Sequence, residues 1–330
     1  MTKSLQVGLI GLGKIGRVHW KNLNDIPDLR VAAIAEKHPP AGESYPADIT
    51  VTSDWREVVE HPEIDAVVIC LPHSLHAACA EAALRNGKHV FLEKPLATNL
   101  QDARMLVKCA AEVGRILMAN MTHRFYPPLQ KARELLQAGT IGNVISVRDY
   151  CMEIIDRSDF PSWFFDPVIA GGGVVITDSI HLLDRVSWLL SEPLSFVGGS
   201  SRRLMPDSNV EDCAEILCTT PSGIPVTIGS FFFSGNKAWG DGLTIFGTKG
   251  KMTVEAWSHV EWNLYGGEKQ REDGYDSGLP AHARPRVGHR AALAEFVSAV
   301  RDNRVPEAEA GTVLNAQEMV EKFYERTKPT

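Results

Sequence analysis

The chain has 330 residues, of which 44% are hydrophobic and 23% are charged, and its formal net charge is −7. This length favours more than one domain, and the composition is typical of a soluble globular protein. The acidic balance argues against a broad binding surface for nucleic acid or for an anionic membrane. We expect no membrane span, because no run of 18 apolar residues occurs. We also expect no signal peptide, because the first five residues lead directly into a strand pattern.

The first 120 residues alternate between short apolar runs and helical patterns. This alternation predicts a parallel sheet built from successive strand–helix–strand units. The predicted strands cover residues 6–10, 29–35, 66–71, 89–92 and 116–119. The predicted helices begin near Lys14, near Ser53 with Asp54 as N-cap, near Leu75, and after Thr98 as N-cap.

The pattern changes after Asn120, where strands begin to dominate. Strands are predicted over residues 144–152, 195–203, 214–220, 225–233, 243–246 and 251–255, and helices over 127–138, 173–190, 289–302 and 312–326. Residues 266–286 are rich in glycine, proline and charge, which predicts a loop with Arg284 and Arg286 in solvent. The expected fold is α/β plus α+β, with a Rossmann domain at 1–123 and, at 124–330, an open-faced, largely antiparallel sheet flanked by helices.

A glycine-rich turn follows the first predicted strand. Gly11, Gly13 and Gly16, with Lys14 and Ile15 between them, have the spacing of a dinucleotide-binding fingerprint. The turn opens a helix, whose amide groups attract a pyrophosphate. The alternative is a glycine turn that binds no ligand.

An acidic residue, Glu36, ends the second predicted strand, twenty positions after Gly16. A carboxylate there can accept hydrogen bonds from the adenosine ribose, which favours NAD over NADP. The neighbouring Lys37 leaves NADP as the alternative, because it could receive a 2′-phosphate.

Glu93, Lys94 and Pro95 come directly after the strand predicted at residues 89–92. A lysine in this position can reach a cofactor that lies across the strand ends. Oxidation of an alcohol needs a base for the hydroxyl proton, and a lysine in a desolvated site can serve as that base. The alternative is a solvated surface lysine.

The six cysteines form no C-x-x-C pair. We therefore expect free thiols in a cytoplasmic protein, rather than disulfides or a metal site.

The motifs together resemble the Gfo/Idh/MocA family of NAD(P)-dependent oxidoreductases, named for glucose–fructose oxidoreductase and inositol dehydrogenase. The resemblance rests on the glycine turn, on Pro72 to His76, on Ala83 to Val90, on Glu93 to Pro95, on Arg124-Phe125, and on Trp163, Gly171 to Gly173, His181 and Asp184. It implies a dehydrogenase or reductase acting on a hydroxyl or carbonyl group of a sugar, polyol or related compound. It also implies cofactor contacts by Leu71, Pro72, His73, His76, Glu93 and Lys94.

The resemblance pairs Lys94 with His181 for proton handling. On an ideal helix Thr177, Asp178, His181, Asp184 and Arg185 share one polar stripe, opposite an apolar side. Most catalytic relatives carry an aspartate four residues before the histidine, where this chain has Thr177. Asp178 is expected to substitute in part. The alternative is a solvent-facing histidine.

Arg124, Trp163 and Asp166 are further candidates for substrate contacts, and packing at the interface between the two domains is the alternative. Two other functions are compatible with the motifs: an NAD-dependent glycosidase, and a dinucleotide-binding regulator without catalytic activity. The resemblance also implies a homodimer or homotetramer.

Overall fold

The computed structural model describes residues 4–38, 45–205, 208–234 and 238–327. The chain forms two compact units, the first from Met1–Asn120 with His289–Leu314 and the second from Met121–Gly288 with Asn315–Thr330. The sequence prediction assigned all residues after 123 to the second domain. The structure differs, because residues 289–314 return to the first unit.

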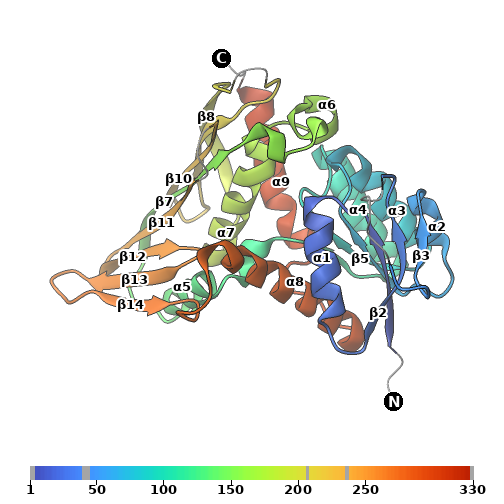
Figure 1. The fold of residues 1–330 in the computed structure, drawn as a ribbon. Coiled ribbons are helices and arrows are strands. Elements are labelled where there is room, and N and C mark those ends of the chain that lie inside the picture. The colour runs from blue at the N-terminus through green and yellow to red at the C-terminus, as the bar shows by residue number, and fades with distance from the viewer. Residues whose placement is uncertain (1–3, 39–44, 206–207, 235–237, 328–330) are drawn as a thin grey trace. The chain divides into compact units, whose positions relative to one another are not determined.

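The first unit contains a six-stranded parallel sheet in the order β3-β2-β1-β4-β5-β6 (Figure 1). Its strands are β1 (Leu5–Ile10), β2 (Leu29–Ala35), β3 (Thr50–Thr52), β4 (Ala66–Ile69), β5 (His89–Leu92) and β6 (Leu117–Ala119). Its helices are α1 (Lys14–Asn24), α2 (Trp55–Glu60), α3 (His76–Arg85) and α4 (Leu100–Val113), with a 3-10 turn η1 (His73–Leu75). All four residues of β4 are buried, as expected for a parallel strand covered on both faces. The predicted Rossmann architecture is confirmed.

N-cap residues were predicted for two helices of this unit, α2 and α4. Asp54 caps α2 by accepting a hydrogen bond from the Arg56 amide, as predicted. The predicted cap of α4 was wrong, because Asn99 and not Thr98 accepts from the Asp102 amide.

The second unit is built on an eight-stranded sheet in the order β14-β13-β12-β11-β7-β10-β9-β8. Its strands are β7 (Val144–Ile155), β8 (Ser195–Arg202), β9 (Cys213–Thr219), β10 (Pro225–Ser234), β11 (Ala238–Gly247), β12 (Gly250–Glu255), β13 (His259–Leu264) and β14 (Gln270–Asp273). Among the described strands of this sheet, β7 and β10 form the only parallel pair. In β9 the side chains alternate, with Ala214, Ile216 and Cys218 buried. The predicted, largely antiparallel sheet with one covered face is therefore confirmed.

Helices and short turns complete the second unit. They are η2 (Thr122–Phe125), α5 (Pro127–Gln137), η3 (Arg157–Asp159), η4 (Ser162–Phe165), α6 (Pro167–Ala170), the π-helical turn η5 (Val175–Ser179), α7 (Ile180–Leu190) and η6 (Ala281–Ala283). The helix α5 packs against α7, β12 and β13. The two last helices, α8 (Arg284–Asp302) and α9 (Ala310–Arg326), each contribute residues to both units.

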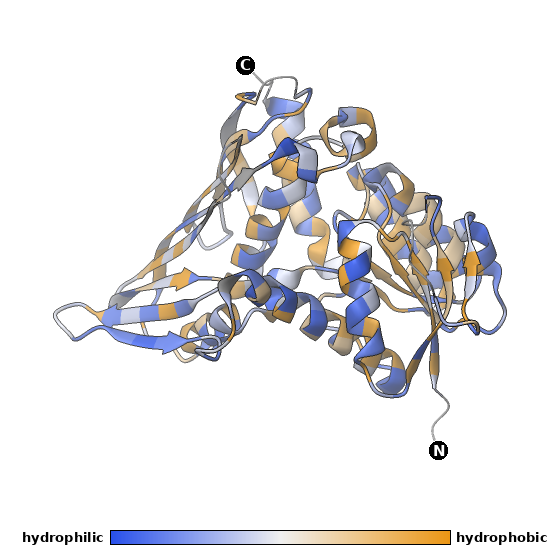
Figure 2. Ribbon diagram, in the orientation of Figure 1, coloured by the Kyte–Doolittle hydropathy of each residue, from blue (hydrophilic) through white to orange (hydrophobic). Residues whose placement is uncertain are grey.

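The loop predicted over residues 266–286 was partly wrong. It contains β14, whose four residues are exposed and hydrophilic (Figure 2), so no apolar pattern marks this strand. It also contains the first turn of α8. Arg284 is not a solvated loop residue, because its guanidinium donates to the carbonyls of Leu279 and Trp257.

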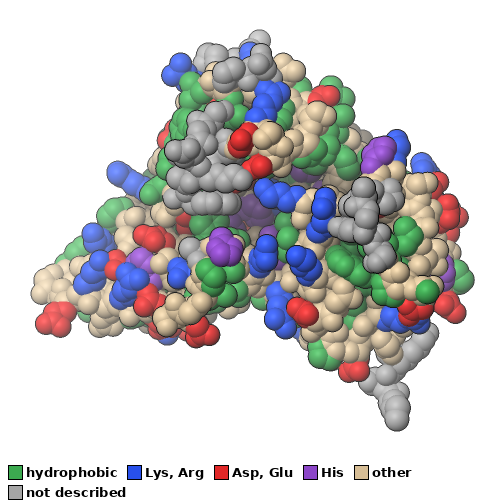
Figure 3. Space-filling model, viewed as in Figure 1, with side chains coloured by type: hydrophobic (Ala, Val, Ile, Leu, Met, Phe, Trp, Pro, Cys, Tyr) green, Lys and Arg blue, Asp and Glu red, His purple; other side chains and the backbone are tan. Residues whose placement is uncertain are grey.

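All six cysteines are free thiols. On the face shown in Figure 3, basic and acidic side chains are interspersed. Within the described part of the chain, no helix combines the length and the apolar character needed to cross a bilayer.

Candidate active site

The glycine turn between β1 and α1 has the geometry of a nucleotide-binding turn. Gly11 has a φ of +93°, and a Cβ atom there would lie 2.4 Å from the Cys70 carbonyl oxygen. A Cβ atom on Gly16 would lie 2.0 Å from the Gly11 carbonyl oxygen, so only glycine allows α1 to pack this closely. A Cβ atom on Gly13 would meet nothing within 4 Å. The turn therefore leaves open space at Gly13, where a pyrophosphate could approach the backbone, and α1 begins at Lys14 followed by Ile15.

Glu36 lies beside this turn, immediately after β2. Its carboxylate accepts from the Leu12 amide at 2.5 Å and from the His38 amide at 2.9 Å. The acid is thus fixed next to the glycine turn, where the fingerprint requires it. These residues fit the adenosine and pyrophosphate parts of a dinucleotide.

His76 ties together the two loops that follow β4 and β5. Its Nδ1 lies 2.7 Å from the Pro95 carbonyl oxygen and its Nε2 lies 2.8 Å from the Leu71 carbonyl oxygen. A neutral imidazole has one N–H and can donate to only one of these carbonyls at a time. Burial lowers the pKa of His76, and the charge of Lys94 acts in the same direction, against the two carbonyl contacts. The predicted cofactor-contact segment Leu71, Pro72, His73 is thereby anchored to the loop that carries Lys94.

Lys94 is half-buried and joined to Pro95 by a cis peptide bond. The charge of Lys94 helps to lower the pKa of two histidines of the first unit, His76 and His289. Burial lowers the pKa of His289 to about 4, and the Lys94 charge contributes to this lowering. The lowered pKa favours the neutral form of His289 at neutral pH.

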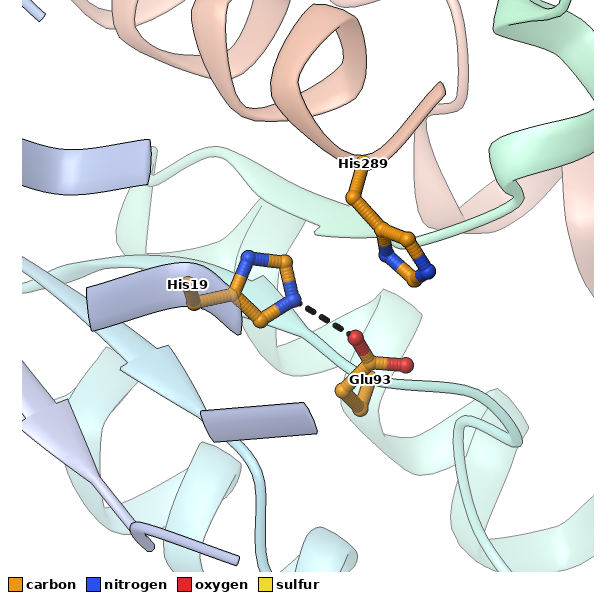
Figure 4. A group of neighbouring side chains, drawn as sticks. All are labelled: His19, Glu93 and His289. Atoms are coloured by element: carbon orange, nitrogen blue, oxygen red, sulfur yellow. Dashed lines mark hydrogen bonds and ion pairs between the residues drawn. The ribbon is translucent and has the colours of Figure 1, made fainter. Parts of the chain in front are cut away.

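Glu93, directly before Lys94, belongs to a buried network of polar side chains (Figure 4). Its Oε1 accepts from His19 Nε2 at 2.7 Å and from Asn120 Nδ2 at 2.6 Å. Asn120 Nδ2 also lies 3.1 Å from His289 Nδ1. These four residues come from α1, the ends of β5 and β6, and α8.

His19, Glu93 and His289 have ligand atoms within 4.8 Å of one another, as a metal centre would require. However, Glu93 Oε1 and His289 Nδ1 already accept hydrogen bonds, and His19 Nε2 carries the proton that it donates to Glu93. The Asn120 amide donates to Glu93 Oε1 and faces His289 Nδ1, and His19 is bonded directly to Glu93. The arrangement favours a hydrogen-bond network over a metal centre.

In the second unit, His181 lies on α7 and stacks on His123 of η2. The two ring centroids are 4.6 Å apart with an interplanar angle of 18°. His123 Nδ1 lies 3.3 Å from Arg185 Nη1. Because a guanidinium can only donate, this contact requires His123 Nδ1 to be the acceptor, so that His123 is neutral with its proton on Nε2.

Three residues of the polar stripe predicted around His181 are buried, namely Thr177, Asp184 and Arg185, while Asp178 and His181 are half-buried. Arg185 is fully buried and bonds both Asp149 and Asp241. Arg124 makes two bonds to Asp184, and both side chains are at most 4% exposed. Arg124 is therefore paired with a residue of its own unit.

Thr177 and Asp178 lie in the π-helical turn η5, which precedes α7. The Thr177 hydroxyl is buried and donates to the Gly173 carbonyl oxygen at 2.8 Å. The predicted α-helix over residues 173–190 is therefore α-helical only from Ile180 onward, because Val175–Ser179 form the π turn. The grouping of Thr177, Asp178 and His181 on one face stays a prediction.

Gly171 to Gly173 allow other parts of the second unit to approach the start of η5. A Cβ atom on Gly173 would lie 1.8 Å from the Glu211 carbonyl oxygen, and one on Gly172 would lie 2.0 Å from the Tyr324 hydroxyl. The Glu211 carboxylate accepts from the amides of Gly173 and Val175. This glycine motif thus positions the helical segment that carries His181.

Two candidates near residue 165 have ordinary structural placements. Asp166 caps α6 by accepting from the Val168 amide. Trp163 is half-buried in η4, with its ring 6.0 Å from that of Phe164.

Four residues of these sites were not predicted from the sequence: His19, Asn120, His123 and His289. The only sequence signal for them is a polar residue inside or next to an apolar pattern.

The glycine turn, Glu36 and the parallel sheet define an NAD-binding Rossmann domain. A family model described as "Oxidoreductase family, NAD-binding Rossmann fold" matches residues 5–121, and a model described as "GFO/IDH/MocA C-terminal domain" matches residues 129–253. The chain belongs to the Gfo/Idh/MocA family of NAD(P)-dependent oxidoreductases.

Curated relatives match three quarters of the chain. An uncharacterized oxidoreductase, YrbE, of Bacillus subtilis is 29% identical over 265 residues, covering 77% of this chain and 75% of the relative. A myo-inositol 2-dehydrogenase of Thermotoga maritima is 26% identical over 260 residues, covering 76% and 75%. A 1,5-anhydro-D-fructose reductase of Ensifer adhaerens is 30% identical over 259 residues, covering 76% and 74%.

Solved structures share the fold over almost the whole chain. An oxidoreductase domain protein from Kribbella flavida has a TM-score of 0.85 at 23% identity, covering 98% of this chain and 97% of the other. A levoglucosan dehydrogenase in complex with NADH and levoglucosan has a TM-score of 0.85 at 21% identity, covering 98% and 96%.

Proposed function

We propose that this protein is an NAD-dependent dehydrogenase that oxidises a hydroxyl group of a sugar or cyclic polyol, or reduces the matching ketone. The observation that carries the proposal is Lys94, which follows β5 at the carboxyl edge of the NAD-binding sheet, in a loop held by Glu93 and His76. Relatives that match three quarters of the chain are named for inositols and for 1,5-anhydro-D-fructose. These compounds are rings that carry several hydroxyl groups.

In this proposal the chain's own residues handle the proton, and bound NAD supplies the hydride acceptor. Lys94 removes the hydroxyl proton, because it is the half-buried base nearest the end of β5. His181 acts as a second acid or base or as a substrate hydroxyl contact, with Asp178 nearby in sequence. Trp163 remains a proposed substrate contact. Arg124 and Thr177 are not carried into the proposal, because their polar groups are bonded within the second unit.

NAD is the proposed cofactor, rather than NADP. Glu36 supports this choice, because its carboxylate lies beside the glycine turn and would repel a 2′-phosphate. Equal affinity for the two cofactors, or tighter binding of NADP, would contradict this choice.

The test is the substitution Lys94→Ala, assayed with a panel of inositols, sugars and anhydrosugars by following NADH. We expect turnover to fall by about 100-fold or more, since a positioned base contributes on the order of 10²–10⁴ to the rate. NAD binding should change little. The matched control is Lys108→Ala, an exposed lysine of α4 paired with Glu112, which should leave turnover unchanged.

Other results would redirect the proposal. Unchanged turnover in Lys94→Ala would remove the role of Lys94. NAD binding without turnover of any compound would favour a regulator, and glycoside cleavage without net NADH would favour the glycosidase.

We also propose a homodimer or homotetramer. The outer face of the eight-stranded sheet leaves Tyr150 and Leu217 exposed, which suits contact with a second copy. Light scattering coupled to size-exclusion chromatography measures this directly.

A further inference from the structure

The network around Glu93 directs its hydrogen bonds to one oxygen of the carboxylate. His19 Nε2 and Asn120 Nδ2 both bond Oε1, and Figure 4 shows the second oxygen pointing away from His19. The side chain is only 8% exposed. One oxygen is thus held by the protein, while the other is left to interact with whatever binds beside it.

The hydrogen-bond pattern does not set up either histidine as a cation. The Asn120 amide faces His289 Nδ1 as a donor, so His289 Nδ1 accepts and the ring is neutral. His19 Nδ1 is buried and has no hydrogen-bond partner among the described residues. Among the described residues, only the Nε2 proton of His19 has an acceptor, the Glu93 carboxylate.

Glu93 itself is held in its charged form. Burial raises the pKa of its carboxyl group, but the hydrogen bond from His19, the electrostatic effects of His19 and His289, and the hydrogen bond from Asn120 together outweigh this effect, so the pKa lies well below its usual value. The network therefore maintains a negative charge in a buried position.

The place of this charge in the sheet is on the nicotinamide side of the fold. In the strand order, β2 and β5 lie on opposite sides of the β1–β4 pair, where the topology reverses. Glu36 follows β2 on the adenosine side, and Glu93 follows β5 on the other. In doubly wound sheets the dinucleotide crosses the carboxyl ends of the strands at this reversal.

We propose that Glu93 sets the preference of the protein for oxidised over reduced cofactor. Its charge stabilises the positively charged ring of NAD⁺ and not the neutral ring of NADH. His19 and Asn120 hold the carboxylate in place, and His289 is a positioning residue that fixes Asn120. The inference depends on NAD binding and goes beyond the proposed activity, since it needs no knowledge of the substrate.

A simpler role for Glu93 makes a different prediction. If the second oxygen only accepted a hydrogen bond from an uncharged part of the cofactor, it would affect NAD⁺ and NADH equally. The ratio of the two dissociation constants distinguishes the two roles, and neither affinity alone does.

The experiment is a titration of the full chain with NAD⁺, NADH and ADP-ribose, comparing wild type with Glu93→Gln. Glutamine keeps an oxygen that can accept from His19 and Asn120 but removes the charge. We expect the ratio of the NAD⁺ to the NADH dissociation constant to rise by about tenfold, as for loss of a partly screened charge interaction. ADP-ribose, which lacks the nicotinamide, should bind both proteins alike. Glu60→Gln, an exposed carboxylate at the end of α2, is the matched control and should leave the ratio unchanged.

A ratio that stays within twofold of wild type in a folded Glu93→Gln protein would overturn the inference. If that variant does not fold, the wild type decides: NAD⁺ should bind at least as tightly as NADH and more tightly than ADP-ribose. NADH binding more than about tenfold tighter than NAD⁺ would overturn the proposal. These titrations contain no substrate, so failure of the proposed dehydrogenase activity would leave their outcome unaffected.

Discussion

Three glycines of one turn serve different purposes at the scale of single residues. Gly11 provides a positive φ, Gly16 allows α1 to contact the turn, and Gly13 borders open space. The first two are needed by the fold itself. Only Gly13 is free of a packing role, so its lack of a side chain is best explained by the ligand.

Substituting two of these glycines separates folding from binding. Gly13→Ala should leave the free energy of unfolding nearly unchanged, since its φ of −61° suits alanine, while the affinity for NAD falls by about tenfold or more. Gly16→Ala should lower the free energy of unfolding by about 1–3 kcal/mol, because α1 must shift to admit the methyl group. Urea unfolding and NAD titration measure the two effects. A Gly13→Ala protein with unchanged affinity would contradict the assigned pyrophosphate position.

Local motifs identified the glycine turn, Glu36 and Lys94 from the sequence, because each is defined by neighbours along the chain. The partners of Glu93 could not be identified in this way. His19 lies 74 residues away from Glu93, and Asn120 and His289 lie 169 residues apart. Such contacts depend on how strands and helices pack, which no spacing in one sequence displays.

At the scale of elements, strands with a continuous apolar run were predicted almost to the residue. The strands β2 and β5 have the predicted bounds. The strands β3, β13 and β14 were missed. Of these, β3 has only three residues and every residue of β14 is exposed. A strand without a buried face carries no hydrophobic alternation that a sequence could show.

The sequence also did not predict the π-helical turn η5 within the helix expected over residues 173–190. A projection at 3.6 residues per turn placed Thr177 and Asp178 beside His181, but η5 follows a wider spacing. The burial of Asp184 and Arg185 was missed for another reason. Each is neutralised by a partner from a different segment, Arg124 and the pair Asp149 and Asp241.

The substitution Thr177→Asp, which would restore the residue usual in catalytic relatives, should impair this protein. A buried carboxylate cannot donate to the Gly173 carbonyl and would face its oxygen instead. We expect the free energy of unfolding to fall by about 2–4 kcal/mol, with no gain in turnover. Thr177→Ser keeps the hydroxyl and is the control. Higher turnover in Thr177→Asp would show that an aspartate is missing from this site.

At the scale of the whole molecule, the chain leaves the first unit at Asn120 and returns to it at His289. The returning segment completes the sheet edge, since the Ala119 amide donates to the Ala308 carbonyl and Met118 pairs with Glu309. This contact covers the edge strand β6, which would otherwise present unpaired backbone groups. The sequence boundary at residue 123 could not reveal the return, because the helical pattern predicted from residue 289 does not indicate which unit the helix packs against.

The second unit has its own buried charge cluster, in which one arginine serves two aspartates. Arg185 bonds Asp149 and Asp241, and all three are buried. Burial raises the pKa of Asp149 to about 6, and the charge of Asp241 adds to this rise, against the opposing effect of Arg185. The folded protein therefore holds a proton that the unfolded chain releases at a lower pH.

This cluster predicts a dependence of stability on pH. Between about pH 4 and pH 6, Asp149 is ionised in the unfolded chain but protonated in the folded protein. Its contribution to the free energy of unfolding therefore falls as the pH rises through this range, by at most about 3 kcal/mol. Above pH 6 this contribution is constant. Burial lowers the pKa of His89 and of His289 to about 4, so these residues act in the opposite direction over the same range. The comparison must therefore be a difference between wild type and Asp241→Asn, in which Arg185 has a single carboxylate partner. Urea unfolding from pH 4.5 to 7.5 should show the variant gaining stability relative to wild type as the pH rises. If the two plots of the free energy of unfolding against pH were parallel, Asp149 and Asp241 would not compete for Arg185.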